Sequence, residues 1–121
     1  MSRISTHVLD TVLGTPAAGV LVQLDRMLGG VGWSKEGARD ETAQWVRSSI
    51  GKTDADGRCI AKADAVPGFY RLTFNIGVYL KSLGRTSIYP EASITFECDG
   101  VSHYHLPLLL SDNSYTTFRG S

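Results

Sequence analysis

The sequence predicts an all-β fold, an antiparallel β-sandwich with one short helix. Three observations predict it: several short segments alternate apolar and polar residues, turn-forming residues separate those segments, and the chain has the length of one domain. The 121 residues are enough to bury a core without disulfides or a metal. We therefore expect residues 1–121 to form one domain.

Alternation with a period of two is clearest in three segments, 20–25, 70–76 and 94–98. Each segment places its apolar residues on one face, which is typical of half-buried antiparallel strands. Glycine, proline and aspartate occur between the segments and predict turns. These turns lie at residues 13–16, 54–57, 67–68 and 99–100.

Two stretches depart from the strand pattern. Residues 29–42 are rich in glycine and in charged side chains, which predicts a long exposed loop. Residues 78–84 space Tyr79, Leu80 and Leu83 at helical intervals and stop at a glycine. This second pattern predicts a short helix laid against the edge of a sheet.

The composition excludes several classes of function. The 12 Lys and Arg residues balance the 12 Asp and Glu residues, which leaves no basic surface for nucleic acid or for an anionic membrane. No apolar stretch reaches the ~18 residues of a membrane span, and the N-terminal residues lack the apolar centre of a signal peptide. We therefore expect neither nucleic acid nor a membrane as a partner.

The two cysteines bear on compartment and on metal binding. Cys59 and Cys98 belong to no Cys-x-x-Cys motif and to no Cys/His cluster, so neither a zinc site nor a redox motif is expected. Without a secretory signal, two free thiols in a reducing compartment are the better interpretation. We expect a cytoplasmic protein and leave the peroxisome open, although the last residues are not a Ser-Lys-Leu address.

Strand parity places His7 and His105 outside the predicted core. In the first strand, His7 lies on the face opposite Ile4 and Val8. In a long strand predicted over residues 101–110, the apolar stripe falls at even positions and His105 at an odd one. Both histidines are then available for acid–base chemistry, although most histidines on an outer face are simply solvated.

The same parity leaves apolar side chains on a face that would meet solvent in a monomer. Pro107 and Leu109 share this outer face with His105. An exposed apolar patch usually marks an interface, so we expect assembly with further copies of the chain. His103 also points outward, but it stands beside a turn and is the weaker candidate for chemistry.

Residues 54–57 begin like a calcium loop but lack its remaining oxygen ligands and its final glutamate. A hairpin turn is the better interpretation, and Arg58 then follows directly after the turn. Residues 115–121 are rich in threonine and aromatic side chains, which favours a final strand that runs to the last residue rather than a frayed end.

Three segments, taken in order, resemble one family. Residues 5–10 with 14–17 resemble the opening strand and turn of the 5-hydroxyisourate hydrolases, which are transthyretin-like proteins. Residues 53–58 resemble their central hairpin, and residues 103–111 with 118–121 resemble their C-terminal signature. The resemblance runs from Ile4 to Ser121, and three matching segments in order are more specific than any one of them.

The resemblance implies a transthyretin-like β-sandwich assembled as a homotetramer, with active sites in a channel at the dimer–dimer interface. It implies hydrolysis of 5-hydroxyisourate in urate breakdown, with no metal or organic cofactor. The family's catalytic residues fall on His7, Arg58 and His105. The C-terminal residues that line the site fall on Phe118, Arg119, Gly120 and Ser121.

This chain departs from the family pattern at one position of the C-terminal signature. The family normally ends Tyr-Arg-Gly-Ser, whereas this chain has Phe118 in place of the tyrosine. A phenolic hydroxyl that would line the site is therefore missing. The segment 29–42 also looks longer than is usual in the family, which we interpret as surface variation.

The side chains fit the implied chemistry. A histidine titrates near pH ~6.5 and can take a proton from water, and an arginine can stabilise the anionic oxygen that forms at the attacked carbonyl. The sequence leaves open which of His7 and His105 is the base. A small-ligand carrier of the transthyretin type and a structural or adhesion sandwich are the alternatives; both leave the set of His7, Arg58 and His105 without a role.

Overall fold

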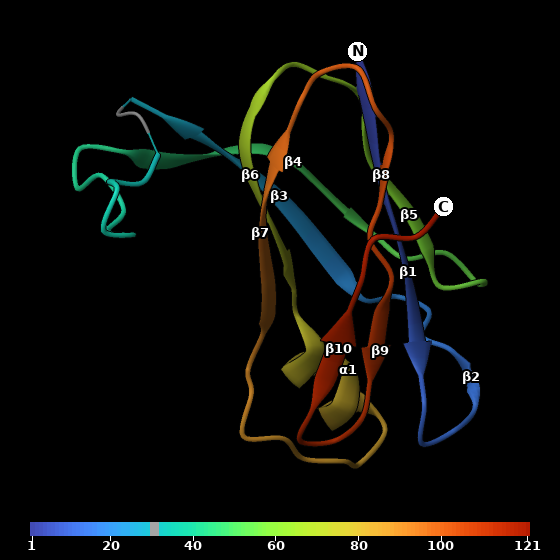
Figure 1. The fold of residues 1–121 in the computed structure, drawn as a ribbon. Helices are drawn as coiled ribbons and strands as arrows, with labels where there is room; N and C mark the ends of the chain where they lie inside the picture. Colours follow the sequence, from blue (N-terminus) through green and yellow to red (C-terminus); the bar gives the residue numbers. More distant parts are fainter. Residues whose placement is uncertain (30–31) are drawn as a thin grey trace.

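The computed structural model describes residues 1–29 and 32–121. Over these residues it has a six-stranded and a four-stranded sheet facing each other, with one short helix (Figure 1). The predicted β-sandwich is thereby confirmed. The elements are β1 (Ser2–Asp10), β2 (Thr15–Pro16), β3 (Leu21–Leu28), β4 (Gln44–Lys52), β5 (Arg58–Ala65), β6 (Gly68–Phe74), α1 (Ile76–Ser82), β7 (Ala92–Cys98), β8 (Tyr104–His105), β9 (Leu108–Leu110) and β10 (Tyr115–Thr117).

Strand β1 organises the first sheet. On one edge it pairs in parallel with β8 near its start and with β9 near its end. On the other edge it pairs antiparallel with β5 and then with β2. Because β1 contacts all four of these strands, it brings segments from both ends of the chain side by side (Figure 1).

The second sheet has the strand order β4-β3-β6-β7. The predicted strands at 20–25, 70–76 and 94–98 correspond to β3, β6 and β7, and their alternating apolar residues face the core. A bulge after Leu24 shifts the pairing of β3 with β4, so that both Leu24 and Asp25 are buried. The largest fully buried side chains include Tyr70, Phe74, Ile4, Leu24, Leu72, Ile76, Leu80, Leu108 and Leu110.

The predicted helix exists, but it begins earlier than expected. Strand β6 ends at Phe74, and the side chain of Asn75 caps the helix by accepting a hydrogen bond from the amide of Val78. Ile76 and Leu80 are the buried residues of α1. Leu83, which the helical spacing placed on the apolar face, is instead 46% exposed because the helix stops before it.

The prediction of one long strand over residues 101–110 is wrong. Two short strands, β8 and β9, are separated by Leu106 and Pro107. Pro107 is buried rather than exposed, and the Thr117 hydroxyl on β10 donates a hydrogen bond to its carbonyl. The outward apolar patch expected from parity is therefore reduced to the half-buried Leu109. The final strand also stops at Thr117 instead of reaching the last residue.

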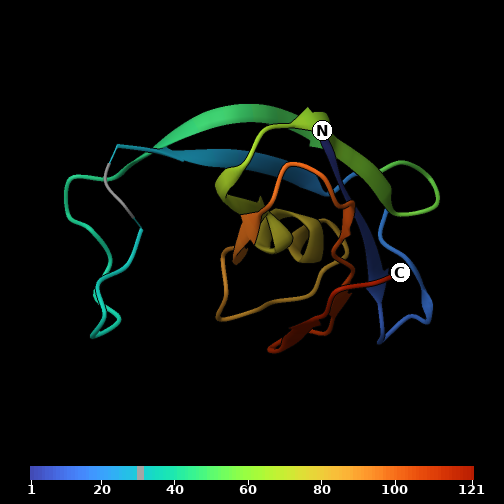
Figure 2. The same cartoon turned by 45° about the horizontal axis from the view of Figure 1, so that its top comes forward.

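The turn at residues 54–57 forms as predicted, but it does not close a paired hairpin. β4, before the turn, belongs to the four-stranded sheet, and β5, after it, pairs with β1 in the other sheet. The chain therefore crosses from one layer to the other at this turn, as Figure 2 shows along its upper edge.

The segment predicted as a long loop extends to one side of the two sheets over its described residues 32–42 (Figures 1 and 2). Residues 30 and 31 of that segment lie outside the described residues. The loop is anchored near its start, because the ring of Trp33 lies edge-on against Phe69 at 4.8 Å. Cys59 and Cys98 are both free, as predicted. Within the described residues, no helix is long and apolar enough to cross a bilayer.

Candidate active site

The register of three neighbouring strands brings the predicted catalytic residues to one face. His7 on β1 is paired directly with Arg58 on β5, and Ser5 on β1 is paired with His105 on β8. Directly paired residues point to the same side of a sheet. Ile4 and Val8, on the opposite side of β1, are fully buried. His7, Arg58 and His105 therefore gather on the outer face of this sheet, as strand parity had predicted for the two histidines.

An open groove of about 840 Å³ lies on this face. Arg58, His105 and Ser121 line it, whereas His7 is not among its lining residues. The charged side chains around the groove are mostly cationic, with Asp54 as the acidic one. The complete lining is Arg3, Ser5, Thr6, Gly51, Lys52, Asp54, Arg58, Cys59, Ile60, His103, His105 and Ser121.

The turn at residues 54–57 holds both His7 and Arg58. Nε2 of His7 lies 2.7 Å from the carbonyl oxygen of Asp56. A carbonyl oxygen can only accept, so Nε2 carries a proton and donates it. The Asp54 carboxylate accepts hydrogen bonds from the amides of Asp56 and Arg58, both at 2.9 Å. The bond from the Arg58 amide is the main reason why the pKa of Asp54 is lowered.

His105 is held through Nδ1, whereas His7 is held through Nε2. Nδ1 lies 2.9 Å from the hydroxyl oxygen of Ser5, which leaves Nε2 without this contact. Burial lowers the pKa of His105, and electrostatic interactions with Arg58, His7 and Arg3 lower it further. The neutral ring is therefore the prevailing form of His105 at neutral pH, which is the form that can accept a proton.

The C-terminal residues divide into two groups. The amide of Gly120 donates to the carbonyl of His105 at 2.7 Å, and Ser121 lines the groove. Arg119 is not among the lining residues: its guanidinium lies 4.4 Å over the ring of Tyr104 and donates to the His103 carbonyl. Phe118 is 51% exposed and is not among the lining residues.

Two residues that line the groove were not predicted as site residues: His103 was the weaker candidate, and Ser5 was not singled out. His103 lines the groove, and its Nδ1 accepts a hydrogen bond from the amide of Arg3 at 3.2 Å. Ser5 lies beside His105 and contacts it directly. The available signal for Ser5 was parity, since it shares the outer face of β1 with His7.

The model of the HIUase/Transthyretin family matches residues 4–120. The chain belongs to this family.

Relatives within the HIUase/Transthyretin family cover the whole chain. A 5-hydroxyisourate hydrolase of Mus musculus is 36% identical and covers 99% of this chain and 96% of its own length. A 5-hydroxyisourate hydrolase of Caulobacter vibrioides is 38% identical, with 100% of both sequences covered.

Solved structures similar to this chain include both a 5-hydroxyisourate hydrolase and a transthyretin. The Klebsiella pneumoniae 5-hydroxyisourate hydrolase has a TM-score of 0.78 at 36% identity, covering 100% of both chains. The transthyretin of Sparus aurata also has a TM-score of 0.78, at 30% identity, covering 97% of this chain and 95% of that one. The backbone is thus similar in both, and the fold alone does not separate the two activities.

Proposed function

We propose that this protein hydrolyses 5-hydroxyisourate to 2-oxo-4-hydroxy-4-carboxy-5-ureidoimidazoline, a step of urate breakdown. The observation that carries the proposal is the convergence of His7, Arg58 and His105 from three strands on one outer face, beside an open groove. The hydrolase names of the Mus musculus and Caulobacter vibrioides relatives support the choice of substrate.

In the proposed reaction, water attacks a ring carbonyl of the substrate. His105 takes the proton from the water, since it lines the groove and its lowered pKa keeps it neutral. The carbonyl electron pair moves onto the oxygen, where the Arg58 guanidinium stabilises the negative charge. When the carbon–nitrogen bond breaks, His105 returns the proton to the leaving nitrogen. His7 donates from Nε2 to the Asp56 carbonyl and keeps Nδ1 to orient water or substrate.

We assign substrate binding to the C-terminal residues Phe118, Arg119, Gly120 and Ser121. Ser121 supports this assignment most directly, because it lines the groove. Gly120 supports it through its hydrogen bond with His105. Phe118 and Arg119 would contribute only where a second copy of the chain brings their exposed side chains against a neighbouring groove.

We also propose that the protein is a homotetramer. In the described part of the chain, β7 pairs only with β6, and β10 pairs only with β9. Each therefore presents an edge of free amide and carbonyl groups on which another copy can continue the sheet. Val12 and Leu13, in the turn after β1, are 57% and 53% exposed and add an apolar contact. Burial of the groove between subunits would exclude bulk water and strengthen the electrostatic interaction between Arg58 and the anionic oxygen.

The two free thiols support a reducing compartment, and we propose the cytoplasm. Cys98 is buried, and Cys59 is half-buried in the wall of the groove. Fractionation of the source cells followed by immunoblotting tests this, and recovery in a secreted fraction would contradict it.

The direct test of the proposed function is to mix the purified protein with freshly generated 5-hydroxyisourate and to follow its ultraviolet absorbance. We expect decay much faster than the spontaneous reaction, without added metal and with no loss in the presence of a chelator. Decay at the spontaneous rate would overturn the hydrolase assignment.

A carrier function is the second candidate, and one observation favours it. Sea bream transthyretin in complex with thyroxine has a TM-score of 0.77 against this chain at 30% identity. Calorimetric titration with thyroxine separates the two functions. We expect no binding at micromolar concentration, because a groove lined by Arg58 and His105 is built for a small polar ring.

A further inference from the structure

The hydrogen bond between Ser5 and His105 determines which nitrogen of this histidine can act as a base. Ser5 Oγ lies 2.9 Å from Nδ1 of His105, and the two residues are paired directly where β1 runs parallel to β8. Both line the groove. Because Nδ1 is already engaged, only Nε2 can exchange a proton with water or substrate in the groove.

A serine hydroxyl can donate to Nδ1 or accept from it, and the two cases differ in their consequence. If Ser5 donates, the proton of the neutral ring sits on Nε2, and that nitrogen is not basic. If Ser5 accepts, the proton sits on Nδ1 and Nε2 has a free electron pair. In this second case the same hydrogen bond persists when Nε2 takes a proton, so His105 can act as a base and recover without any rearrangement.

The backbone around the pair keeps this geometry. The amide of Leu106 donates to the Ser5 carbonyl at 2.9 Å, and the amide of Gly120 donates to the His105 carbonyl at 2.7 Å. A Cβ atom at position 120 would lie 2.9 Å from Cδ2 of His105, the ring carbon next to Nε2. Glycine therefore leaves open the edge of the ring that has to meet water.

We propose that Ser5 is a positioning residue for His105: its hydroxyl accepts the Nδ1 proton of the ring and leaves Nε2 as the basic nitrogen in the groove. The inference rests on the proposed hydrolysis for its catalytic meaning. His7 has the opposite arrangement, since the Asp56 carbonyl keeps the proton on Nε2. The two histidines of the site thus carry their protons on different nitrogens.

The tautomer can be measured without substrate. The protein has 3 histidines, so side-chain nitrogen resonances of a 15N-labelled sample can be assigned with the variants His7→Gln and His103→Gln. At a pH where the rings are neutral, we expect His105 to show a protonated Nδ1 and an unprotonated Nε2. In Ser5→Ala we expect the Nε2-protonated form to take over.

Kinetics then connect the tautomer to the reaction. We expect Ser5→Ala to lower kcat roughly tenfold, the usual factor for a hydrogen bond to a group that becomes charged, with little change in KM. Ser5→Thr retains the hydroxyl and should restore both kcat and the tautomer. Ser82→Ala, at an exposed serine of α1, is the matched control and should leave both unchanged.

Three results would overturn the inference: a His105 ring protonated on Nε2 in the unmodified protein, an unchanged tautomer and kcat in Ser5→Ala, or an acyl group trapped on Ser5 in mass spectrometry. The last would make Ser5 a nucleophile rather than a positioning residue. If the tautomers are as expected but the unmodified protein does not accelerate 5-hydroxyisourate decay, the hydrogen-bond assignment is upheld and the proposed function alone fails.

Discussion

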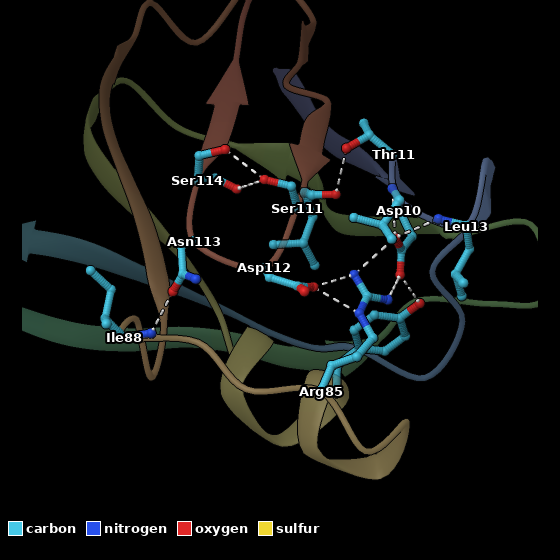
Figure 3. A network of polar contacts seen from close by, with 12 residues as sticks. Asp10, Thr11, Leu13, Arg85, Ile88, Ser111, Asp112, Asn113 and Ser114 are labelled. Atoms are coloured by element: carbon cyan, nitrogen blue, oxygen red, sulfur yellow. Dashed lines mark hydrogen bonds and ion pairs between the residues drawn. The ribbon is translucent and has the colours of Figure 1, made fainter.

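The two ends of strand β1 place titratable side chains in opposite electrostatic surroundings. Near its start, Ser5 lines the groove beside His105, whose pKa is lowered by burial and by nearby positive charges. At its other end, the side chain of Asp10 is completely buried and forms an ion pair with Arg85, which also contacts Asp112 (Figure 3).

Both oxygens of the buried Asp10 carboxylate have hydrogen-bond or ion-pair partners. Besides the ion pair with Arg85, the carboxylate accepts hydrogen bonds from the amides of Val12 and Leu13 and from the Tyr79 hydroxyl at 2.9 Å. Burial alone would raise the pKa of Asp10, but the donors, with Arg85 first, outweigh it and the pKa is lowered. Burial and the bond to Asp10 raise the pKa of Tyr79 to about 12.

The charges around a polar residue on strand β1 decide what that residue can do. Asp10 has donors for both oxygens, so it stays ionised and joins β1 to α1 and to the turn before β10. His105 has a hydroxyl on one nitrogen and cations around it, so it stays neutral and can accept a proton. We expect the Asp10 end of β1 to govern stability and the end beside His105 to govern activity.

The largest expected effect is on activity, at the end of β1 beside His105. His7→Ala, Arg58→Ala and His105→Ala should each lower kcat/KM by about 10²–10⁴-fold, since each removes an acid–base group or the group that stabilises the oxyanion. Unfolding midpoints should change little, because outer-face side chains leave no core cavity. Arg47→Ala, at an exposed arginine of β4, is the control for Arg58. A variant that loses activity only by unfolding would contradict the catalytic assignment of that residue.

The next effect is on the stability end. Arg85→Ala leaves the buried Asp10 carboxylate without its counter-ion and should lower the free energy of unfolding by roughly 2–3 kcal/mol. This is less than the ~3–5 kcal/mol of a fully buried pair, because Tyr79 and two amides still donate and the Arg85 side chain is 14% exposed. Urea unfolding measures the change, and kcat of the folded enzyme should remain near that of the unmodified protein.

Acid should weaken the same end of β1. The folded pKa of Asp10 is lowered, so its contribution to stability is present above the unfolded pKa of ~3.9 and is lost as the pH falls through the lower folded pKa. The stability difference between the unmodified protein and Arg85→Ala should therefore narrow in strong acid. A difference that stays constant down to that range would show that Asp10 is not the group involved.

A smaller effect is expected at Phe118. If the tyrosine usual at this position donates a hydrogen bond in the transition state, Phe118→Tyr should raise kcat by about five- to thirtyfold, which corresponds to roughly 1–2 kcal/mol. Substrate affinity should change little, because the ring is retained. Separate measurement of kcat and of substrate affinity tests this. Unchanged turnover would mean that the residue only packs, which its 51% exposure in the single chain permits.

The smallest effect concerns the pH profile. Activity should fall in acid as His105 becomes protonated, with a midpoint below 6.5 because burial and the charges of Arg58 and Arg3 lower its pKa. Asp54 and His103 also line the groove. Arg3→Gln removes the weakest of the named charges and should move this acid limb slightly to higher pH. A shift to lower pH would contradict the electrostatic account of His105.

Much of the fold could be predicted because its signals are local. Alternation with period two identifies β3, β6 and β7, and in β1 it separates His7 from the buried Ile4 and Val8. Strand β4 was missed, because its residues show no strict alternation of buried and exposed positions. The same local rule was extended wrongly through Pro107, where the chain changes from β8 to β9.

The residue pattern alone predicts a β-sandwich with His7 and His105 outside the core, since side-chain direction in a strand follows from the residue number alone. Which side chains come into contact depends on the tertiary structure. Ser5 and His105 are separated by 100 positions, and Asp10 and Arg85 by 75. Such contacts depend on which strands pair and in which register, and that choice is made by packing of the whole core rather than by any local pattern.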